Sequence, residues 1–265
     1  MSDGARRTPR RPPRIGLTLR ARAGDPGGRG ADRADGWWLQ DALLRCCAGL
    51  GALAWPLAAP RGLDAVGCEA LAQAQVAELD ALILAGGGDL LVAPGMHVPA
   101  GADPLALTRD LYEYALLAAA RGRALPVLGI CRGAQLLHRA AGGELLPADA
   151  ASTPLHLDTG RYLAHHHAVE LAPGTWLAAG HAGAIAEVNS AHRWRIAQPS
   201  ADARVLARCS LDGSVEAFDF PDERCTIGVM WHPECALEHP QALAATPVFG
   251  RLCASWRELS PTIAD

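Results

Sequence analysis

The sequence predicts an α/β fold built on a mostly parallel β-sheet. In the first half of the chain, short apolar runs typical of buried strands alternate with helical patterns. One run ends in a Gly-x-Cys-x-Gly turn at residues 129–133, and a helical pattern follows at once. Strands that alternate with helices usually pair in parallel, so we expect the sheet to be mostly parallel.

The expected elements follow in chain order. In the first half, strands are expected at 15–19, 51–57, 81–84 and 125–130, and helices at 37–48, within 58–79, at 104–121 and after residue 131. In the second half, turn signals separate short strands. These strands are expected at 168–171, 184–188, 205–209, 215–220 and 226–231, followed by a final helix at 240–257.

Length and composition indicate one domain with a sizeable core. The chain has 265 residues, of which 50% are hydrophobic, and a formal net charge of -4. We expect a single domain at 15–258 between an Arg- and Pro-rich tail at 1–14 and a short tail at 259–265. The weak charge argues against nucleic acid as a partner, and no apolar run reaches the ~20 residues of a membrane span. Without a secretory signal pattern, the expected location is cytoplasmic, and the oligomeric state stays open, a homo-oligomer included.

Cys131 is the candidate nucleophile. It follows a buried strand and precedes a helix, where the helix dipole favours a thiolate. Glycines on both sides permit the sharp turn. The backbone N–H of Arg132 would point at a developing oxyanion, whereas its side chain could bind a substrate carboxylate or a nearby acid. The alternative is a structural cysteine in a glycine-rich turn.

His232 and Glu234 are the candidate base and its orienting carboxylate. They follow the last expected strand in the segment Trp231-His232-Pro233-Glu234. His232 would take the thiol proton and pass it to the leaving amine, while Glu234 would hold the imidazole tautomer. A plain surface loop is the alternative.

A glycine-rich loop at residues 86–89 is the candidate second oxyanion donor. It follows an expected buried strand, and we assign the donor N–H to Gly87, with Gly86 and Gly88 beside the substrate. No phosphate-loop pattern is present. A simple tight turn is the alternative.

Two charged clusters are interpreted as structural. Consecutive residues of a strand point to opposite faces, so His165, His166 and His167 do not suit one metal ion, and no metal is expected. Arg109, Asp110 and Glu113 lie one helical turn apart and suit an ion-pair cluster better than catalysis.

Several motifs together resemble one family. PVLGICRGAQ at 126–135 and GVMWHPE at 228–234 resemble the nucleophile and His–Glu segments of the class I glutamine amidotransferase-like superfamily. The stretches GGGD at 86–89, RDLYE at 109–113, VNSAH at 188–192 and DGSVEA at 212–217 are similar to its γ-glutamyl-γ-aminobutyrate hydrolase branch, which is peptidase C26-like.

The resemblance implies a flavodoxin-like three-layer sandwich with a nucleophile elbow at the carboxyl edge of the sheet. It implies cleavage of a γ-glutamyl amide through a thioester, in amine or polyamine catabolism, with a small-molecule substrate and no cofactor. Expected substrate-binding residues are Gly86, Gly88, Gln135, Asn189, Ser190 and His192. A glutaminase subunit that supplies ammonia to a synthetase, and a ligand-binding protein without activity, are the alternatives. The amine is left open.

Overall fold

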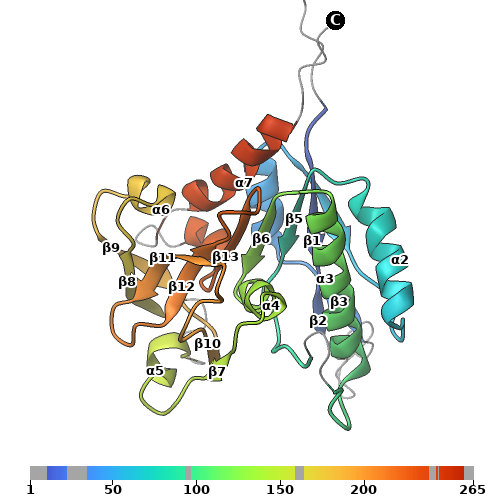
Figure 1. Ribbon diagram of the computed structural model, residues 1–265, viewed down its shortest axis with the longest axis horizontal. Helices are drawn as coiled ribbons and strands as arrows, with labels where there is room; N and C mark the ends of the chain where they lie inside the picture. The colour runs from blue at the N-terminus through green and yellow to red at the C-terminus, as the bar shows by residue number, and fades with distance from the viewer. Residues whose placement is uncertain are drawn as a thin grey trace, which may run out of the picture.

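A nine-stranded sheet forms the centre of the molecule (Figure 1). The computed structural model describes residues 11–22, 35–92, 97–158, 164–238, 243 and 245–259. The strand order of the sheet is β4-β1-β5-β6-β13-β12-β11-β8-β9. Its strands are β1 (Arg14–Thr18), β4 (Leu53–Leu57), β5 (Ala81–Leu84), β6 (Val127–Ile130), β8 (His166–Leu171), β9 (Ile185–Asn189), β11 (Arg204–Cys209), β12 (Val215–Asp219) and β13 (Thr226–Val229).

The sheet has two halves. From β4 to β13 the neighbouring strands pair in parallel, and from β13 to β9 they pair antiparallel. Two small pairs lie outside it: β2 (Arg20–Arg22) with β3 (Gly36–Trp38), and β7 (Leu146–Pro147) with β10 (Trp194–Arg195). The predicted α/β fold with a parallel core is confirmed.

Helices cover both faces of the parallel half. The helices α1 (Asp41–Gly49) and α7 (Ala245–Leu259) pack on one face, and α2 (Ala65–Val76), α3 (Pro104–Gly122) and α4 (Arg132–Ala140) pack on the other (Figure 1). Two short helices, α5 (Thr153–His156) and α6 (Trp176–Ala179), and the 3-10 helix η3 (Pro233–Glu238) complete the described elements. The parallel strands β5, β6 and β13 are therefore buried on both sides, which explains their continuous apolar runs, whereas the edge strand β4 is largely exposed.

Alternate side chains of each strand enter the two cores. In β5, Leu82 and Leu84 face the core under α2, α3 and α4, whereas Ile83 faces the core under α1 and α7. Aspartates cap two of the helices: the Asp64 carboxylate accepts the backbone N–H of Gly67 at the start of α2, and the Asp103 carboxylate accepts that of Leu105 at the start of α3. The continuous apolar runs, whose alternate side chains enter opposite cores, and the helix caps explain why these segments adopt the predicted elements.

The structure corrects the predicted elements in two places. Residues 36–38 form strand β3 instead of the first turn of a helix, and α1 begins only at Asp41. Aromatic residues favour strands, and Trp37 and Trp38 pair with β2. The last helix is described from Ala245, and residue 243 before it is not helical; residues 239–242 and 244 lie outside the described part.

Both predicted tails lie largely outside the described residues. Of the first tail, residues 1–10 are not described, while Arg11 pairs with Asp80 and Arg14 begins β1. Of the second, only Leu259 is described, as the end of α7. Within the described part, no helix is both long and apolar enough to cross a membrane.

Candidate active site

Cys131 lies at a strained turn between β6 and α4. Its φ of 50° is in the left-handed region, which side chains other than glycine rarely adopt. A Cβ on Gly129 would come within 2.6 Å of the Gly133 backbone, and a Cβ on Gly133 would meet the carbonyl oxygen of Leu84. Glycine at both positions is therefore what lets the strand turn directly into the helix.

The surroundings of Cys131 favour its thiolate. Cys131 is only 4% exposed and stands at the N-cap of α4, the positive end of the helix dipole. Burial opposes ionisation, but the positive charge of His232 and a hydrogen bond with it lower the pKa of Cys131 below its ordinary value. By contrast, burial raises the pKa of Cys47 to about 12. Cys131 is thus set apart from a buried structural thiol.

His232 and Glu234 lie beside the thiol because β13 is the parallel neighbour of β6. Val229 pairs with Ile130, so the segments that follow both strands meet at one sheet edge. His232 Nδ1 is 2.8 Å from Glu234 Oε1, and both side chains are buried. Burial opposes the charged imidazole, but Glu234 and Cys131 raise the pKa of His232 well above its ordinary value. The geometry suits an imidazolium next to a thiolate.

The glycine-rich loop passes directly against His232. A Cβ on Gly86 would lie 2.7 Å from Cε1 of the His232 ring, so any side chain there would displace the imidazole. Gly87 has φ +154°, and a Cβ on it would meet the guanidinium of Arg109. Glycine at these two positions allows the loop backbone to approach the imidazole and the ion cluster below it.

A buried ion cluster supports both the elbow and the loop. Arg132 pairs with Asp110 and Glu113, and Arg109 pairs with Glu113 at 2.8 Å. Arg109 also donates to the carbonyl oxygens of Ala85 and Gly86 at 2.9 and 3.0 Å. The predicted ion-pair cluster is confirmed, and the open choice for the Arg132 side chain is decided in favour of an ion pair.

The cluster is buried and its charges are mutually compensated. Burial opposes ionisation of Glu113, but Arg109 and Arg132 lower its pKa below the ordinary value. Asp110 also accepts the backbone N–H groups of Leu91 and Val92. One network therefore holds the residue after the nucleophile and the whole 85–92 loop.

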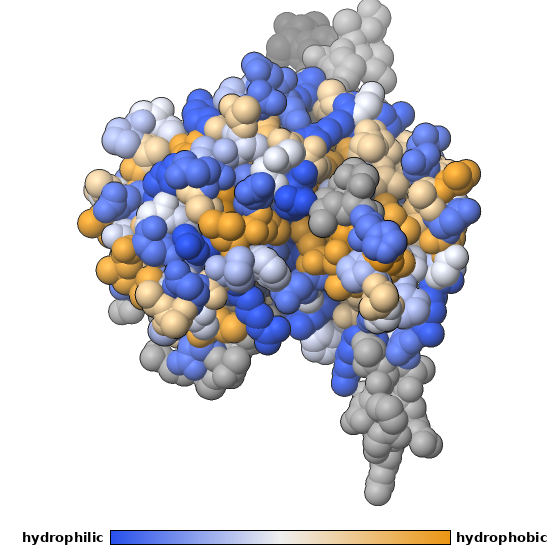
Figure 2. Space-filling model, turned by 60° about the horizontal axis from the view of Figure 1, so that its bottom comes forward, coloured by the Kyte–Doolittle hydropathy of each residue, from blue (hydrophilic) through white to orange (hydrophobic). Residues whose placement is uncertain are grey.

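A cavity of about 260 Å³ opens beside the thiol. It is lined by Cys131, Gln135 and His192, among others, together with Gly87, Gly88 and Asp89 of the glycine-rich loop. Two guanidinium side chains, Arg20 of β2 and Arg193, also line it. The end of the molecule that carries α5, β7 and β10 lies at the bottom of Figure 1, and Figure 2 shows hydrophilic and hydrophobic residues interspersed there.

Three predicted substrate-binding residues, Gly86, Asn189 and Ser190, are not part of the cavity wall. Asn189 Nδ2 donates to the His232 carbonyl at 2.8 Å, and His232 N donates to Asn189 Oδ1 at 2.7 Å. Ser190 donates to the His156 carbonyl at 2.9 Å. Both side chains are 1% exposed, so their polar atoms hold backbone in place instead of facing a ligand.

Sequence reasoning did not foresee two features of the site. Arg20 enters the cavity wall through the unpredicted β2–β3 pair. His156, His167 and Glu216 gather behind His192, from segments far apart in the chain. The pattern GWW at 36–38 was a signal for the strand pair, whereas no spacing pattern connects the four clustered residues.

Comparison with known families decides the relationship. Residues 50–234 match the Peptidase C26 family model, which is more than half of the chain. The chain belongs to the Peptidase C26 family. The predicted membership of this branch of the class I glutamine amidotransferase-like superfamily is thereby confirmed.

Individual relatives agree with this membership of Peptidase C26. The chain is 32% identical over 209 residues to γ-glutamyl-γ-aminobutyrate hydrolase PuuD of Escherichia coli K12, covering 74% of this chain and 78% of the relative. It is 36% identical over 164 residues to the Mycobacterium tuberculosis protein Rv2859c, covering 60% of this chain and 52% of that protein. The chain thus spans about half the length of the latter.

A solved structure agrees with the fold. The glutaminase domain of Trypanosoma brucei CTPS, solved with bound acivicin, superposes with a TM-score of 0.59 at 15% identity. The match covers 95% of this chain and 96% of that domain. At this identity the similarity establishes the flavodoxin-like architecture, and function must be argued from the site.

Proposed function

We propose that this protein is a cysteine hydrolase that cleaves a γ-glutamyl amide, such as γ-glutamyl-γ-aminobutyrate, through a thioester on Cys131. Membership of Peptidase C26 supports a hydrolase. The observation that carries the proposal is the buried thiol at the strained turn before α4, whose pKa is lowered by His232, with His232 Nδ1 2.8 Å from Glu234 Oε1. A nucleophile, a base and an orienting carboxylate are the parts that acyl transfer requires.

In the first step, the Cys131 thiolate adds to the γ-carbonyl carbon of the substrate. The electron pair of the C=O bond moves to the oxygen, which the backbone N–H groups of Arg132 and Gly87 stabilise. The His232 imidazolium then gives its proton to the amide nitrogen while the C–N bond breaks. The amine leaves, and the glutamyl group remains on sulfur as a thioester.

In the second step, His232 removes a proton from a water molecule, and the resulting hydroxide adds to the thioester carbon. The C–S bond breaks, glutamate leaves, and the thiolate is restored beside the imidazolium. Glu234 keeps Nδ1 of His232 protonated in both steps, so that Nε2 exchanges the proton. Asn189 holds the His232 backbone on both sides and acts as a positioning residue.

The cavity suits the zwitterionic end of a γ-glutamyl group. Its wall contains Arg20 and Arg193, which suit the α-carboxylate, and Asp89, which suits the α-ammonium group. Asp89 Oδ2 lies 4.0 Å from Arg193 Nη1, so opposite charges are already adjacent at the rim. We expect Arg20→Ala to raise KM for γ-glutamyl amides more than it lowers kcat.

Glutamate release by the purified protein tests the proposal. The panel is γ-glutamyl-γ-aminobutyrate, other γ-glutamyl amines, short γ-glutamyl peptides and glutamine, with Cys131→Ala as the control. Turnover of a γ-glutamyl amide well above that of glutamine, lost in Cys131→Ala, is the expected result. Turnover of glutamine alone would favour a glutaminase subunit, and no turnover of any member would favour a binding protein.

A further inference from the structure

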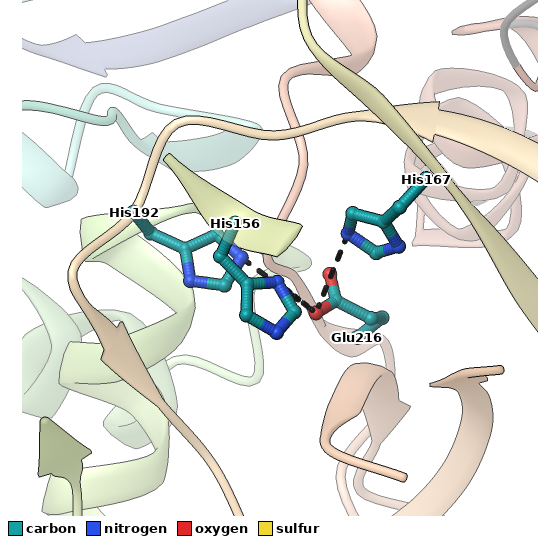
Figure 3. Close-up of side chains that lie close together, drawn as sticks. All are labelled: His156, His167, His192 and Glu216. Carbon is teal, nitrogen blue, oxygen red and sulfur yellow. Dashed lines mark ion pairs between the residues drawn. The ribbon is translucent and has the colours of Figure 1, made fainter. Parts of the chain in front are cut away.

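Four side chains outside the proposed triad converge in the interior beside the cavity (Figure 3). They are His156 at the end of α5, His167 in β8, His192 after β9 and Glu216 in β12. Each histidine has one ring nitrogen 3.6–3.8 Å from Glu216 Oε1. None of the four side chains is more than 2% exposed. Figure 3 shows the three rings directed at one carboxylate.

In each ring, the nitrogen that points away from Glu216 (the outer nitrogen) already donates a hydrogen bond to another group. His156 Nε2 lies 2.9 Å from Asp212 Oδ2, His192 Nδ1 lies 2.9 Å from the Trp194 carbonyl oxygen, and His167 Nδ1 lies 3.2 Å from the Ala168 carbonyl oxygen. Carbonyl and carboxylate oxygens only accept, so the proton of each neutral ring sits on the outer nitrogen. The inner nitrogens then present lone pairs.

The lone pairs of three ring nitrogens thus face the Glu216 carboxylate, and no hydrogen-bond donor among the described residues lies between them. The atoms concerned are His156 Nδ1, His167 Nε2, His192 Nε2 and both oxygens of Glu216, and within the described part of the chain none makes a hydrogen bond of ordinary length. Buried acceptors that face only acceptors are unfavourable. A cation at their centre would remove this conflict.

The spacing suits a metal ion better than a shared proton. Nitrogen–oxygen hydrogen bonds measure about 2.7–3.2 Å, shorter than the separations here. Ligand atoms about 2.0–2.1 Å from a tetrahedral zinc ion lie about 3.4 Å apart, close to the 3.6–3.8 Å observed. Metal-bound histidines usually donate their second nitrogen to a carboxylate or a backbone carbonyl, as all three do here.

We infer that His156, His167, His192 and Glu216 bind a divalent transition metal ion, with zinc as the best match. Three imidazole nitrogens and one carboxylate oxygen, all within 4.8 Å of one another, would fill the four positions of a tetrahedral ion, and a site without an open position is typical of a structural metal. The ion lies behind His192 and fixes the ring that forms the cavity wall next to Cys131. The inference is independent of the proposed hydrolase activity.

This site is compatible with the sequence argument against the histidine triplet. Only His167 of the three consecutive histidines contributes, and its partners come from other segments. The objection to consecutive ligands therefore holds, while the wider expectation of no metal is replaced by this proposal.

Metal analysis of the full-length protein tests the inference. All variants are made in a Cys131→Ala background, so that a thiolate at Cys131 cannot bind zinc. After removal of metal with a chelator and titration with zinc, the parent protein is expected to retain about one equivalent per chain. Glu216→Gln and His156→Asn are expected to retain less than about a tenth of that amount. His166→Gln, a neighbouring histidine of β8 outside the cluster, is the matched control and is expected to retain zinc fully.

Two further measurements keep the test decisive if a variant folds poorly. Zinc is expected to raise the melting temperature of the parent protein and of His166→Gln. Cobalt substituted into the parent is expected to give a tetrahedral spectrum without a thiolate charge-transfer band. Failure of the parent to bind zinc would overturn the inference in favour of a protonated histidine–glutamate network. A thiolate band, which would indicate ligation by another cysteine such as Cys209, would also overturn it.

Discussion

The nucleophile and the base of the proposed triad follow neighbouring parallel strands, yet the molecule holds them in different ways. Cys131 is positioned by its own backbone, through a left-handed φ and glycines two residues away on either side. His232 is positioned from a distance, because Asn189 at the end of edge strand β9 binds both polar groups of its backbone. The antiparallel half of the sheet thus supplies a residue that positions the base, while the parallel half carries the nucleophile and the base.

This difference explains what could be predicted from the sequence. The nucleophile elbow depends only on neighbouring residues, so a strand pattern followed by two glycines within residues 129–133 is enough to indicate it. The helix 104–122 could also be predicted, because its apolar period and its ion pairs lie one turn apart. The roles of Asn189 and Glu216 could not, because they depend on how distant antiparallel strands pair. Trp37 and Trp38 were placed in a helix, because strand pairing with β2 is a non-local contact.

The first prediction concerns Cys131, which is positioned by its own backbone, and has the largest expected effect. We expect Cys131→Ala to lower kcat by at least about 10⁴-fold, because no other group can form the thioester. Melting temperature is expected to change little, since the backbone turn is kept. Cys46→Ala is the matched control, because Cys46 is also buried but lies in α1, and burial raises its pKa to about 11. Substantial residual activity in Cys131→Ala would refute the nucleophile assignment.

The second prediction concerns the effect of His232 on the pKa of Cys131. We expect His232→Ala to lower kcat by about 10³-fold or more and to raise the pKa of Cys131, since His232 is what lowers it. In the unmodified protein, alkylation of Cys131 is expected to persist below pH 9.0, the ordinary thiol value, and to fall as pH drops through the lowered pKa. In His232→Ala, the rate is expected to fall already above pH 9.0, because burial raises the pKa of the thiol. Identical alkylation profiles would show that the imidazole does not stabilise the thiolate.

The third prediction concerns the support below the elbow. Removing one partner of a buried ion cluster leaves uncompensated charge, so Glu113→Gln is expected to lower the free energy of unfolding by about 3–5 kcal/mol. Urea denaturation measures this change. Glu78→Gln is the matched control, because Glu78 is 58% exposed and its pair with Arg14 is worth less than about 1 kcal/mol. Equal effects in both variants would mean that the cluster does not support the fold.

The fourth prediction concerns Asn189, which holds His232 from the distant strand β9, and has the smallest expected effect. Asn189→Ala is expected to lower kcat about tenfold while KM stays nearly constant, because the imidazole loses its fixed direction but the cavity wall is unchanged. Steady-state kinetics on the best γ-glutamyl amide measures both constants. A rise in KM with kcat unchanged would instead assign Asn189 to substrate binding.

The ion cluster also links the chemistry of the site to the packing of α3. Arg109 of α3 binds the carbonyls of the glycine-rich loop, and Arg132 beside the nucleophile binds Asp110 and Glu113 of the same helix. Neither proposed oxyanion donor reaches its place until α3 has docked on the sheet. The proposed oxyanion hole is therefore complete only in a molecule in which α3 is packed on the sheet.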